Sequence, residues 1–522
     1  MSIRTGMSRR TLLGLSASAL AVSTLAACGA DESGSSSPNG GGTLTVGFDN
    51  EPVSLDPALS AAISSDRNLL NLFYEGLVRQ EKDGTIVPAL AESWQVDGST
   101  VTFKLRTGVT FHDGSAFDAD AAAWNLKRVL DPATNSTKAS TLSKISSVTV
   151  VDPVTLKVQT EAPDPLLLTQ LSYEPGMMVS QKAAVAAGKD FGRNPVGTGP
   201  FVFERWVAKS QLSAKRNPSY WRKDADGKAL PRLDKVVARF ISEPKTLRAE
   251  LSTGGVQLVR ALPPEEFNQL ENNGQVKLDD LGVRRSYYLA VNSAKAPFDN
   301  PQVRKALAGA IDRDGVGKTA ASGEYDLSPT FATKTDWFYD SALAAPAYDA
   351  AKAKAAFAAA GIAPGTAVKL VVRNRPPDPT IAQLIQANLE AAGLTVTIEA
   401  LQLESYLDKL KKGDFDLGLG VIDVPRYDPS LTFDPYLHTG AANNFSQIKD
   451  PELDKLLDAA RATGDRETRK KAYVDAQRRT LEQSHLVFLH QARSPVIHHS
   501  DLKGLAFDLD GQWRLHEATV GR

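Results

Sequence analysis

VKLVVRNRPPDPTIAQLIQANLEAAGLTVTIEALQLESYLDKLKKGDFDLGLGV, residues 368–421, is the stretch that decides the fold class. Its apolar segments at 368–372, 395–400 and 415–421 predict strands, and the segments between them predict helices. Gly393 and Gly413 each stand where a helix ends, at a position that favours a left-handed backbone. Strands that alternate with helices run parallel, so this order predicts an α/β, or mixed α+β, body.

The residues before this stretch extend the same interpretation. Leu44, Val46 and Phe48 alternate with smaller or polar residues and predict a strand. The stretch 80–195 predicts hairpins and one helix around Trp124. Asn300 followed by proline is typical of a helix start. No internal repeat accompanies these elements.

Composition excludes several classes of protein. The chain has 522 residues with 60 Lys and Arg, 61 Asp and Glu, and one cysteine. Its formal net charge of -1 provides no basic field, so we expect no nucleic-acid partner. One cysteine excludes disulfides within the chain. Beyond the N-terminal segment no apolar run approaches the roughly 20 residues that cross a bilayer.

The first 42 residues predict export and a membrane tether. Residues 1–27 combine a basic start with an apolar stretch and small residues, which is typical of a signal peptide. Arg9 and Arg10 resemble a twin-arginine export signal, and the LAAC sequence ending at Cys28 resembles a bacterial lipobox. Residues 28–42 are rich in Gly and Ser and predict a flexible linker after a lipid-modified Cys28.

Motifs of the common catalytic sites are missing from the sequence. It contains no GxSxG, HExxH, GxxxxGK[ST] or CxxC. His498 and His499 are adjacent, and neighbours on a strand face opposite ways, so one metal ion is not expected to take both. The sequence therefore predicts no enzyme, no metal site and no cofactor.

A set of short motifs follows in order along residues 43–522. The motifs are EPVSLDP (51–57), YEGL (74–77), PALAESW (88–94), VTFKLR (101–106), FHDG (111–114), NPVGTGPF (194–201), RNPSYW (216–221), PFDN (297–300), VRKAL (303–307) and YD (348–349). Jointly they resemble the bacterial extracellular solute-binding proteins of family 5, receptors of ABC importers that take up peptides, nickel complexes and opines.

The resemblance implies a two-lobed fold of the type II periplasmic-binding-protein kind with an additional subdomain, closing on its ligand by hinge motion. We expect the chain to cross between lobes in the apolar runs 288–292 and 487–490. The expected order is 43–79 lobe I, 80–195 extra subdomain, 196–288 lobe I again, 289–488 lobe II, and 489–522 the return segment of lobe I.

The resemblance also indicates candidate ligand-binding residues. Arg375, followed by proline, resembles the arginine that holds the ligand carboxylate in dipeptide binders, and a guanidinium suits that role. Where peptide binders carry a Gly-Trp segment and an amine-pairing acid, this chain has isoleucine and proline instead. Asp423 and Asp428 lie close to this stretch and are candidates for a displaced amine-pairing acid. Arg426, Tyr427 and Ser60 are the remaining candidates.

These features predict an exported lipoprotein on the outer face of the bacterial membrane. We expect a monomer that contacts the membrane only through its lipid. It would capture a small polar solute, foremost a di- or oligopeptide, and deliver it to an ABC permease and its ATPase. A metal-chelate or opine receptor of the same family is the alternative, and a sensor lipoprotein or a secreted hydrolase is a more remote one.

Overall fold

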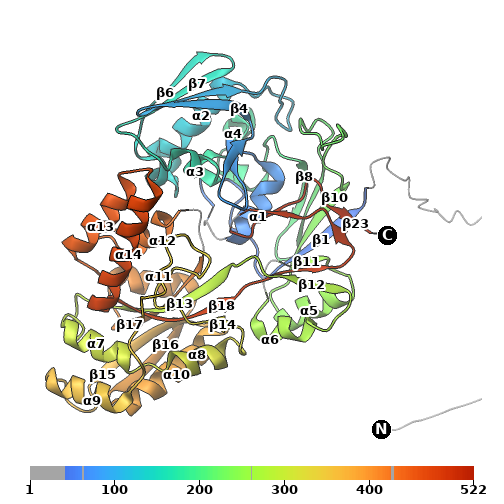
Figure 1. Cartoon of the computed structure of the whole chain (residues 1–522). Coiled ribbons are helices and arrows are strands. Elements are labelled where there is room, and N and C mark those ends of the chain that lie inside the picture. The colour runs from blue at the N-terminus through green and yellow to red at the C-terminus, as the bar shows by residue number, and fades with distance from the viewer. Residues whose placement is uncertain (1–40, 61–63, 260–261, 425–427, 509, 522) are drawn as a thin grey trace, which may run out of the picture. The chain divides into compact units, whose positions relative to one another are not determined.

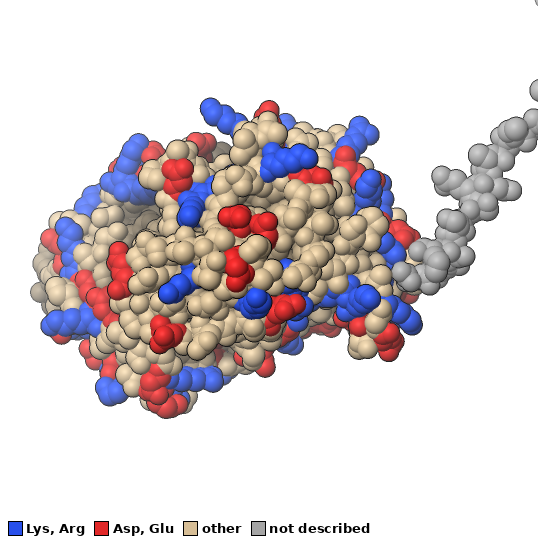
Figure 2. All heavy atoms as spheres, turned by 90° about the horizontal axis from the view of Figure 1, so that it is seen from above, with Lys and Arg blue, Asp and Glu red and all other residues tan. Residues whose placement is uncertain are grey.

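The computed structural model describes residues 41–60, 64–259, 262–424, 428–508 and 510–521. Cys28, Arg9, Arg10, Arg426 and Tyr427 lie outside the described residues. The three sheets with four or more strands each have helices beside them (Figure 1). On the face seen in Figure 2, basic and acidic side chains are interspersed. Among the described helices, none is both long and apolar enough to cross a membrane.

The first sheet has seven strands and takes its strands from both ends of the chain. Leu44, Val46 and Phe48 of its central strand are buried, as their alternation predicts. That strand pairs in parallel with β10 and β11, and the other pairings are antiparallel. In spatial order the strands are β12 (Val276–Asp279), β19 (Val496–His499), β11 (Leu258–Val259), β1 (Thr43–Phe48), β10 (Lys235–Phe240), β9 (Gln211–Arg216) and β8 (Phe201–Val207).

The second sheet has six strands and contains the stretch that decides the fold class. Its order is β14 (Tyr325–Asp326), β18 (Leu486–Arg493), β13 (Arg284–Val291), β17 (Leu417–Val424), β15 (Ala367–Arg373) and β16 (Thr395–Leu401). As predicted, β15 runs parallel to β16 and β17. The crossover helices are α10 (Asp378–Ala391) and α11 (Leu403–Lys412). Gly413 ends α11 with φ of 69°, the left-handed conformation that its position favours.

A four-stranded antiparallel sheet follows the first part of the seven-stranded sheet in sequence. Its order is β4 (Ala91–Asp97), β5 (Thr100–Leu105), β7 (Thr155–Thr160) and β6 (Ile145–Asp152), and α2 (Ala119–Leu130) covers it. Asp118 caps α2 by accepting a bond from the Ala121 amide. This part of the chain has the hairpins and the helix around Trp124 that the sequence predicts.

Shorter elements complete the described chain. The remaining helices are α1 (Ser64–Phe73), α3 (Leu167–Leu171), α4 (Gln181–Ala187), α5 (Pro244–Ser252), α6 (Pro264–Phe267), α7 (Pro301–Gly309), α8 (Arg313–Ala320), α9 (Ala350–Ala359), α12 (Ser430–Leu437), α13 (Pro451–Arg461) and α14 (Arg466–Gln483). The 3-10 turns are η1 (Pro132–Thr134), η2 (Ala139–Leu142), η3 (Glu174–Gly176), η4 (Gly188–Arg193) and η5 (Asn268–Leu270). The two-stranded sheets are β2 (Val78–Gln80) with β3 (Ile86–Pro88), β20 (Leu502–Lys503) with β23 (Thr519–Val520), and β21 (Ala506–Phe507) with β22 (Trp513–Arg514).

The chain passes between the seven-stranded and six-stranded sheets in two short connections. One is 280–283, between β12 and β13, and the other is 494–495, between β18 and β19. The runs 288–292 and 487–490, where the sequence places the crossings, lie a few residues away. Most of their residues belong to β13 and β18, which pair with each other, so their apolar character reflects burial inside a sheet. The lobe boundaries themselves stay predictions.

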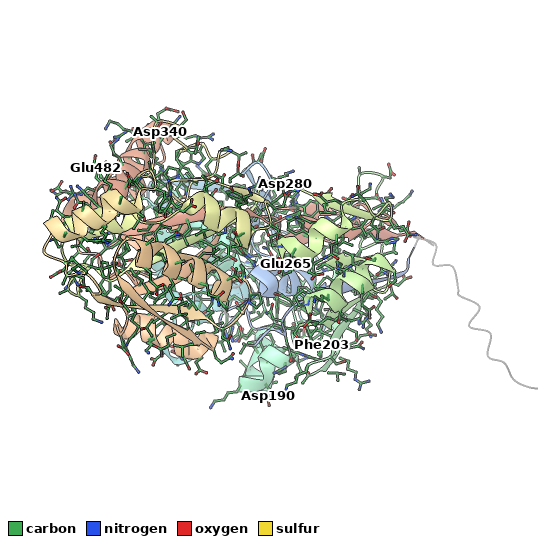
Figure 3. All side chains as sticks on the ribbon, turned by 90° about the horizontal axis from the view of Figure 1, so that it is seen from below. Asp190, Phe203, Glu265, Asp280, Asp340 and Glu482 are labelled. Atoms are coloured by element: carbon green, nitrogen blue, oxygen red, sulfur yellow. The ribbon has the colours of Figure 1, made fainter. Side chains whose placement is uncertain are left out.

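An ion network ties the two connections together. Asp280, labelled in Figure 3, accepts a hydrogen bond of 2.8 Å from Nη1 of Arg284. Its other oxygen lies 3.3 Å from Nε of Arg493. Arg493 also lies 3.5 Å from the carboxylate of Glu271 and 3.0 Å from that of Glu324. The start of β13 and the end of β18 therefore meet in one shared cluster of charges.

Candidate functional site

A cavity of about 730 Å³ is lined by residues of both large sheets and of the segments beside them. Three groups of side chains give it its chemistry. They are a buried charge network, two more exposed ion pairs, and a set of aromatic and aliphatic side chains. A volume of a few hundred Å³ lined in this way is typical of a site for one small ligand.

The buried charge network is centred on Arg67 of α1. Its guanidinium donates bonds of 2.9 and 2.7 Å to the two oxygens of Glu174 in η3 and one of 3.1 Å to Asp510. Its carbon lies 3.5 Å from the centre of the Tyr173 ring. Burial by itself would lower the pKa of Arg67, but the two carboxylates hold that pKa above its usual range. In this part of the lining, the cation is therefore already paired with carboxylates of the protein.

The first exposed ion pair stands on neighbouring strands of the six-stranded sheet. Arg285 of β13 faces Asp423 of β17 in register, and its Nε lies 3.1 Å from the carboxylate. Both side chains are 30% exposed. The attraction of Asp423 raises the pKa of Arg285. Asp423 was a candidate from sequence, and the structure places it in the cavity lining beside a cation that sequence reasoning missed.

The second exposed pair joins residues that follow strands of the two large sheets. Nη2 of Arg375, which follows β15, lies 3.6 Å from the carboxylate of Asp49, which follows β1. The Arg375 side chain is 54% exposed. Arg373 beside it instead makes bonds of 2.6 and 2.8 Å to Asp378 and is mostly buried. Arg375 is therefore the more available of the two guanidinium groups to an entering solute.

The aromatic part of the lining comes from the six-stranded sheet and the helices beside it. Tyr288 of β13 packs edge-on against Tyr436 of α12, with ring centres 6.1 Å apart. Tyr406 of α11 is also buried, and its hydroxyl donates a 2.6 Å bond to the carbonyl of Leu419. All three tyrosines line the cavity. They supply flat apolar surface within reach of the charged groups.

Two other candidates lie outside the cavity lining. Asp428 is buried, and both of its oxygens accept bonds, of 2.6 and 2.7 Å, from Nη2 of Arg469. Ser60 is buried as well, and its carbonyl accepts a 3.0 Å bond from Nζ of Lys138. Neither residue is among those that line the cavity, although Lys138 is. Among the described residues, no group of three or more His, Cys, Asp or Glu side chains could hold a metal ion.

Sequence reasoning missed several lining residues, and only some of them leave a signal. Arg285 directly precedes the mostly apolar run 286–291. A charged residue at the end of a buried strand is such a signal. Asp49, just beyond β1, belongs to the same kind of position. Arg67 and Gln512 leave none, because their places in the lining depend on segments more than 400 residues apart.

Two α/β sheets joined by two short connections, with a cavity lined from both, define the two-lobed periplasmic binding proteins. The family model of the bacterial extracellular solute-binding proteins, family 5 Middle, matches residues 85–444, and the chain belongs to this family. It is thus a solute-binding protein of the ABC-importer type and no enzyme, as its relatives are receptors. The predicted fold class and the predicted family are confirmed.

Individual relatives bind different solutes. The glutathione-binding protein GsiB of Pectobacterium atrosepticum is 29% identical over 480 residues, which are 90% of this chain and 92% of that protein. The binding protein DppA of Helicobacter pylori, solved with the peptide STSA, matches with a TM-score of 0.80 at 27% identity, covering 91% of this chain and 98% of its own. AgaA of A. tumefaciens R10, solved with agropinic acid, also matches with a TM-score of 0.80 at 27% identity, covering 92% and 99%.

Proposed function

We propose that this chain is the extracytoplasmic receptor of an ABC importer for short peptides. It captures a di- or oligopeptide between two closing lobes and delivers it to the permease and its ATPase. The observation that carries this proposal is the cavity lining, which offers exposed charge of both signs next to aromatic surface. A peptide is zwitterionic, and a closed cleft must replace the hydration of both of its ends.

Each end of such a ligand has a candidate partner. Arg375 suits the carboxylate, because a guanidinium can donate two parallel bonds to it. Asp423 and Asp49 suit the amine, and each is now paired with an arginine at the cavity surface. Ligand binding would replace these exposed pairs without breaking the buried Arg67 network.

An opine receptor is the second candidate function. The match to AgaA, solved with agropinic acid, has the same TM-score and identity as the match to the peptide-bound DppA. Opines also carry both signs of charge, so the ion pairs suit either class. Peptides are the first choice because the aromatic lining suits amino-acid side chains.

Native mass spectrometry of the purified chain followed by calorimetry tests the proposal. A peptide that co-purifies or binds on titration is the expected result, and Arg375→Ala should weaken its binding about 30-fold or more, the usual cost of leaving a desolvated charge unpaired. Arg478→Ala, which removes an exposed arginine of α14 outside the cavity lining, is the control. An opine that binds where no peptide does would favour the second candidate.

The N-terminal segment supports attachment to the outer face of the membrane. We infer that residues 1–27 are removed and that Cys28 is lipidated, with Arg9 and Arg10 directing export. Cys28→Ala should then move the chain from the membrane to the soluble fraction on fractionation. Replacing both arginines with lysine should block export, whereas undiminished export would indicate the general secretion route. We expect a monomer, which light scattering can check.

A further inference from the structure

One end of the cavity lies against the hydrophobic cluster that packs beside the six-stranded sheet. Six side chains belong to this cluster and line the cavity at the same time: Tyr288, Ile422 and Tyr406, which are buried, and Leu407, Tyr436 and Phe445, which are partly buried. We call this set the apolar subsite. Its members come from β13, β17, α11, α12 and the loop after α12. A site of this kind offers a ligand apolar area rather than charge.

The floor of the apolar subsite depends on a glycine. Gly420 of β17 stands directly opposite Tyr288 of β13 and also lines the cavity. A Cβ on Gly420 would lie 2.2 Å from Cζ of the Tyr288 ring, so the ring lies over a strand that has no side chain there. Phe331 packs edge-on against the same ring at 5.3 Å and holds it in place. The ring is thus a fixed surface next to the cavity.

Charges near the subsite are already satisfied. Arg373, which acts electrostatically on Tyr288 and Tyr406, is bonded to Asp378 through two hydrogen bonds. A charged ligand side chain entering the subsite would lose hydration without gaining a free partner of opposite charge among these residues. The subsite therefore discriminates against charge as well as offering apolar contact.

The exposed ion pair of Arg285 and Asp423 stands on the same two strands as the apolar subsite but on the other face of the sheet. The pair lies three positions from Tyr288 and Gly420, and side chains three positions apart on a strand point to opposite faces. Tyr288 packs in the hydrophobic cluster of one face and Tyr287 in that of the other. The ion pair and the apolar subsite are thus separate parts of the cavity lining.

We propose that the apolar subsite is a specificity pocket for an aromatic or large aliphatic side chain, so that the ligands of this receptor are short peptides that carry such a residue. This inference rests on the proposed function as a peptide receptor. It specifies which peptides the receptor binds, and it assigns their selection to the six side chains of the apolar subsite. Peptides with only small or charged side chains are then weak ligands.

Calorimetric titration of the full chain with a set of tripeptides tests the inference. The probes are Ala-Ala-Ala, Phe-Ala-Ala, Ala-Phe-Ala, Ala-Ala-Phe and the three matching peptides with glutamate in place of phenylalanine. At least one phenylalanine peptide should bind about 10-fold or more tightly than Ala-Ala-Ala, as expected for burying a large apolar side chain. The glutamate peptide of the same order should bind no better than Ala-Ala-Ala.

A matched pair of variants locates the preference. Leu407→Ala removes apolar area from the subsite and should reduce the phenylalanine advantage to about threefold or less. Leu456→Ala is the control, since Leu456 is a partly buried leucine of the same cluster that does not line the cavity. Thermal unfolding of both variants checks that they remain folded.

The outcomes separate this inference from the proposed function. If Ala-Ala-Ala binds and phenylalanine gives no advantage, or if glutamate binds more tightly, the specificity pocket is refuted while the peptide receptor stands. If phenylalanine is preferred equally in both variants, the preference arises elsewhere and the assignment to this subsite is wrong. If no peptide of the set binds, the proposed function fails and the inference fails with it.

Discussion

On the part of the cavity lining built from α1, η3 and the C-terminal hairpin, Arg67 and Glu174 are 7% and 10% exposed and bonded to each other. On the part built from β13 and β17, Arg285 and Asp423 are each 30% exposed. The first pair has lost its hydration during folding and is satisfied within the protein. The second retains water that a ligand can displace. The comparison indicates that charge serves stability in one region and binding in the other.

The strongest way to break this comparison is to remove the buried cation. Arg67→Ala leaves Glu174 and Asp510 without it and should lower the free energy of unfolding by about 3–5 kcal/mol. Arg239→Ala, which breaks an ion pair about one-third exposed with Glu250, should cost less than about 1 kcal/mol. Urea unfolding of both variants measures the difference. Equal losses would show that burial does not separate the two kinds of pair.

The exposed pair should respond in binding instead. Asp423→Asn removes the proposed partner of the peptide amine and should weaken the tightest tripeptide by about 2 kcal/mol or more, roughly 30-fold. Its effect on unfolding should be smaller than that of Arg67→Ala. Calorimetry measures the change in affinity and urea unfolding the change in stability. A stability loss without an affinity loss would place Asp423 in the same class as Arg67.

A partly buried acid extends the comparison to the pH dependence of stability. Burial raises the pKa of Asp434 in α12 to about 7, well above its value in an unfolded chain. The folded chain then binds more protons than the unfolded one between about pH 4 and pH 7, so this group lowers stability as pH rises through that range. Asp434→Asn should raise the free energy of unfolding by about 1–3 kcal/mol at pH 8 and hardly at all at pH 4.5.

The control for this pH effect is its exposed neighbour. Asp434 and Asp458 both pair with Arg461. Asp458 is 57% exposed, so Asp458→Asn should change stability by less than about 1 kcal/mol at either pH. Thermal unfolding of the two variants at both pH values measures the four changes in stability. The same gain from both substitutions would mean that the effect comes from Arg461 and not from the burial of Asp434.

Ligand binding should also close the molecule. Saturating tripeptide should reduce the radius of gyration in solution scattering, since hinge closure shortens the molecule. Scattering curves that stay identical with and without ligand would contradict closure.

The smallest effect is expected at the connections between the sheets. Arg493→Ala removes part of the network around Asp280 and should change peptide affinity by less than about 1 kcal/mol, because these ion pairs are partly exposed.

Local periodicity predicts much of the fold, because a strand or helix is encoded in adjacent residues. The segments 368–372 and 395–400 and the helix end at Gly413 are where the pattern puts them. The site depends on pairings that periodicity does not contain. Sequence reasoning about Asp428 had no means to find Arg469, which lies 41 positions later and bonds both of its oxygens. Asp423 and Arg375 were found through resemblance, and their partners Arg285 and Asp49 only through the register and the fold.

The placement of β1 and β19 in the seven-stranded sheet has a consequence for the order of folding. Residues 43–48 form its central strand, yet residues 496–499 lie between β12 and β11 in the same sheet. During synthesis the earliest strand must wait for a strand made some 450 residues later before the sheet is complete. Such distant pairings slow folding, and the exposed edges of the unfinished sheet can pair wrongly in the meantime. Truncating the last thirty residues should therefore yield an aggregation-prone chain rather than a smaller receptor.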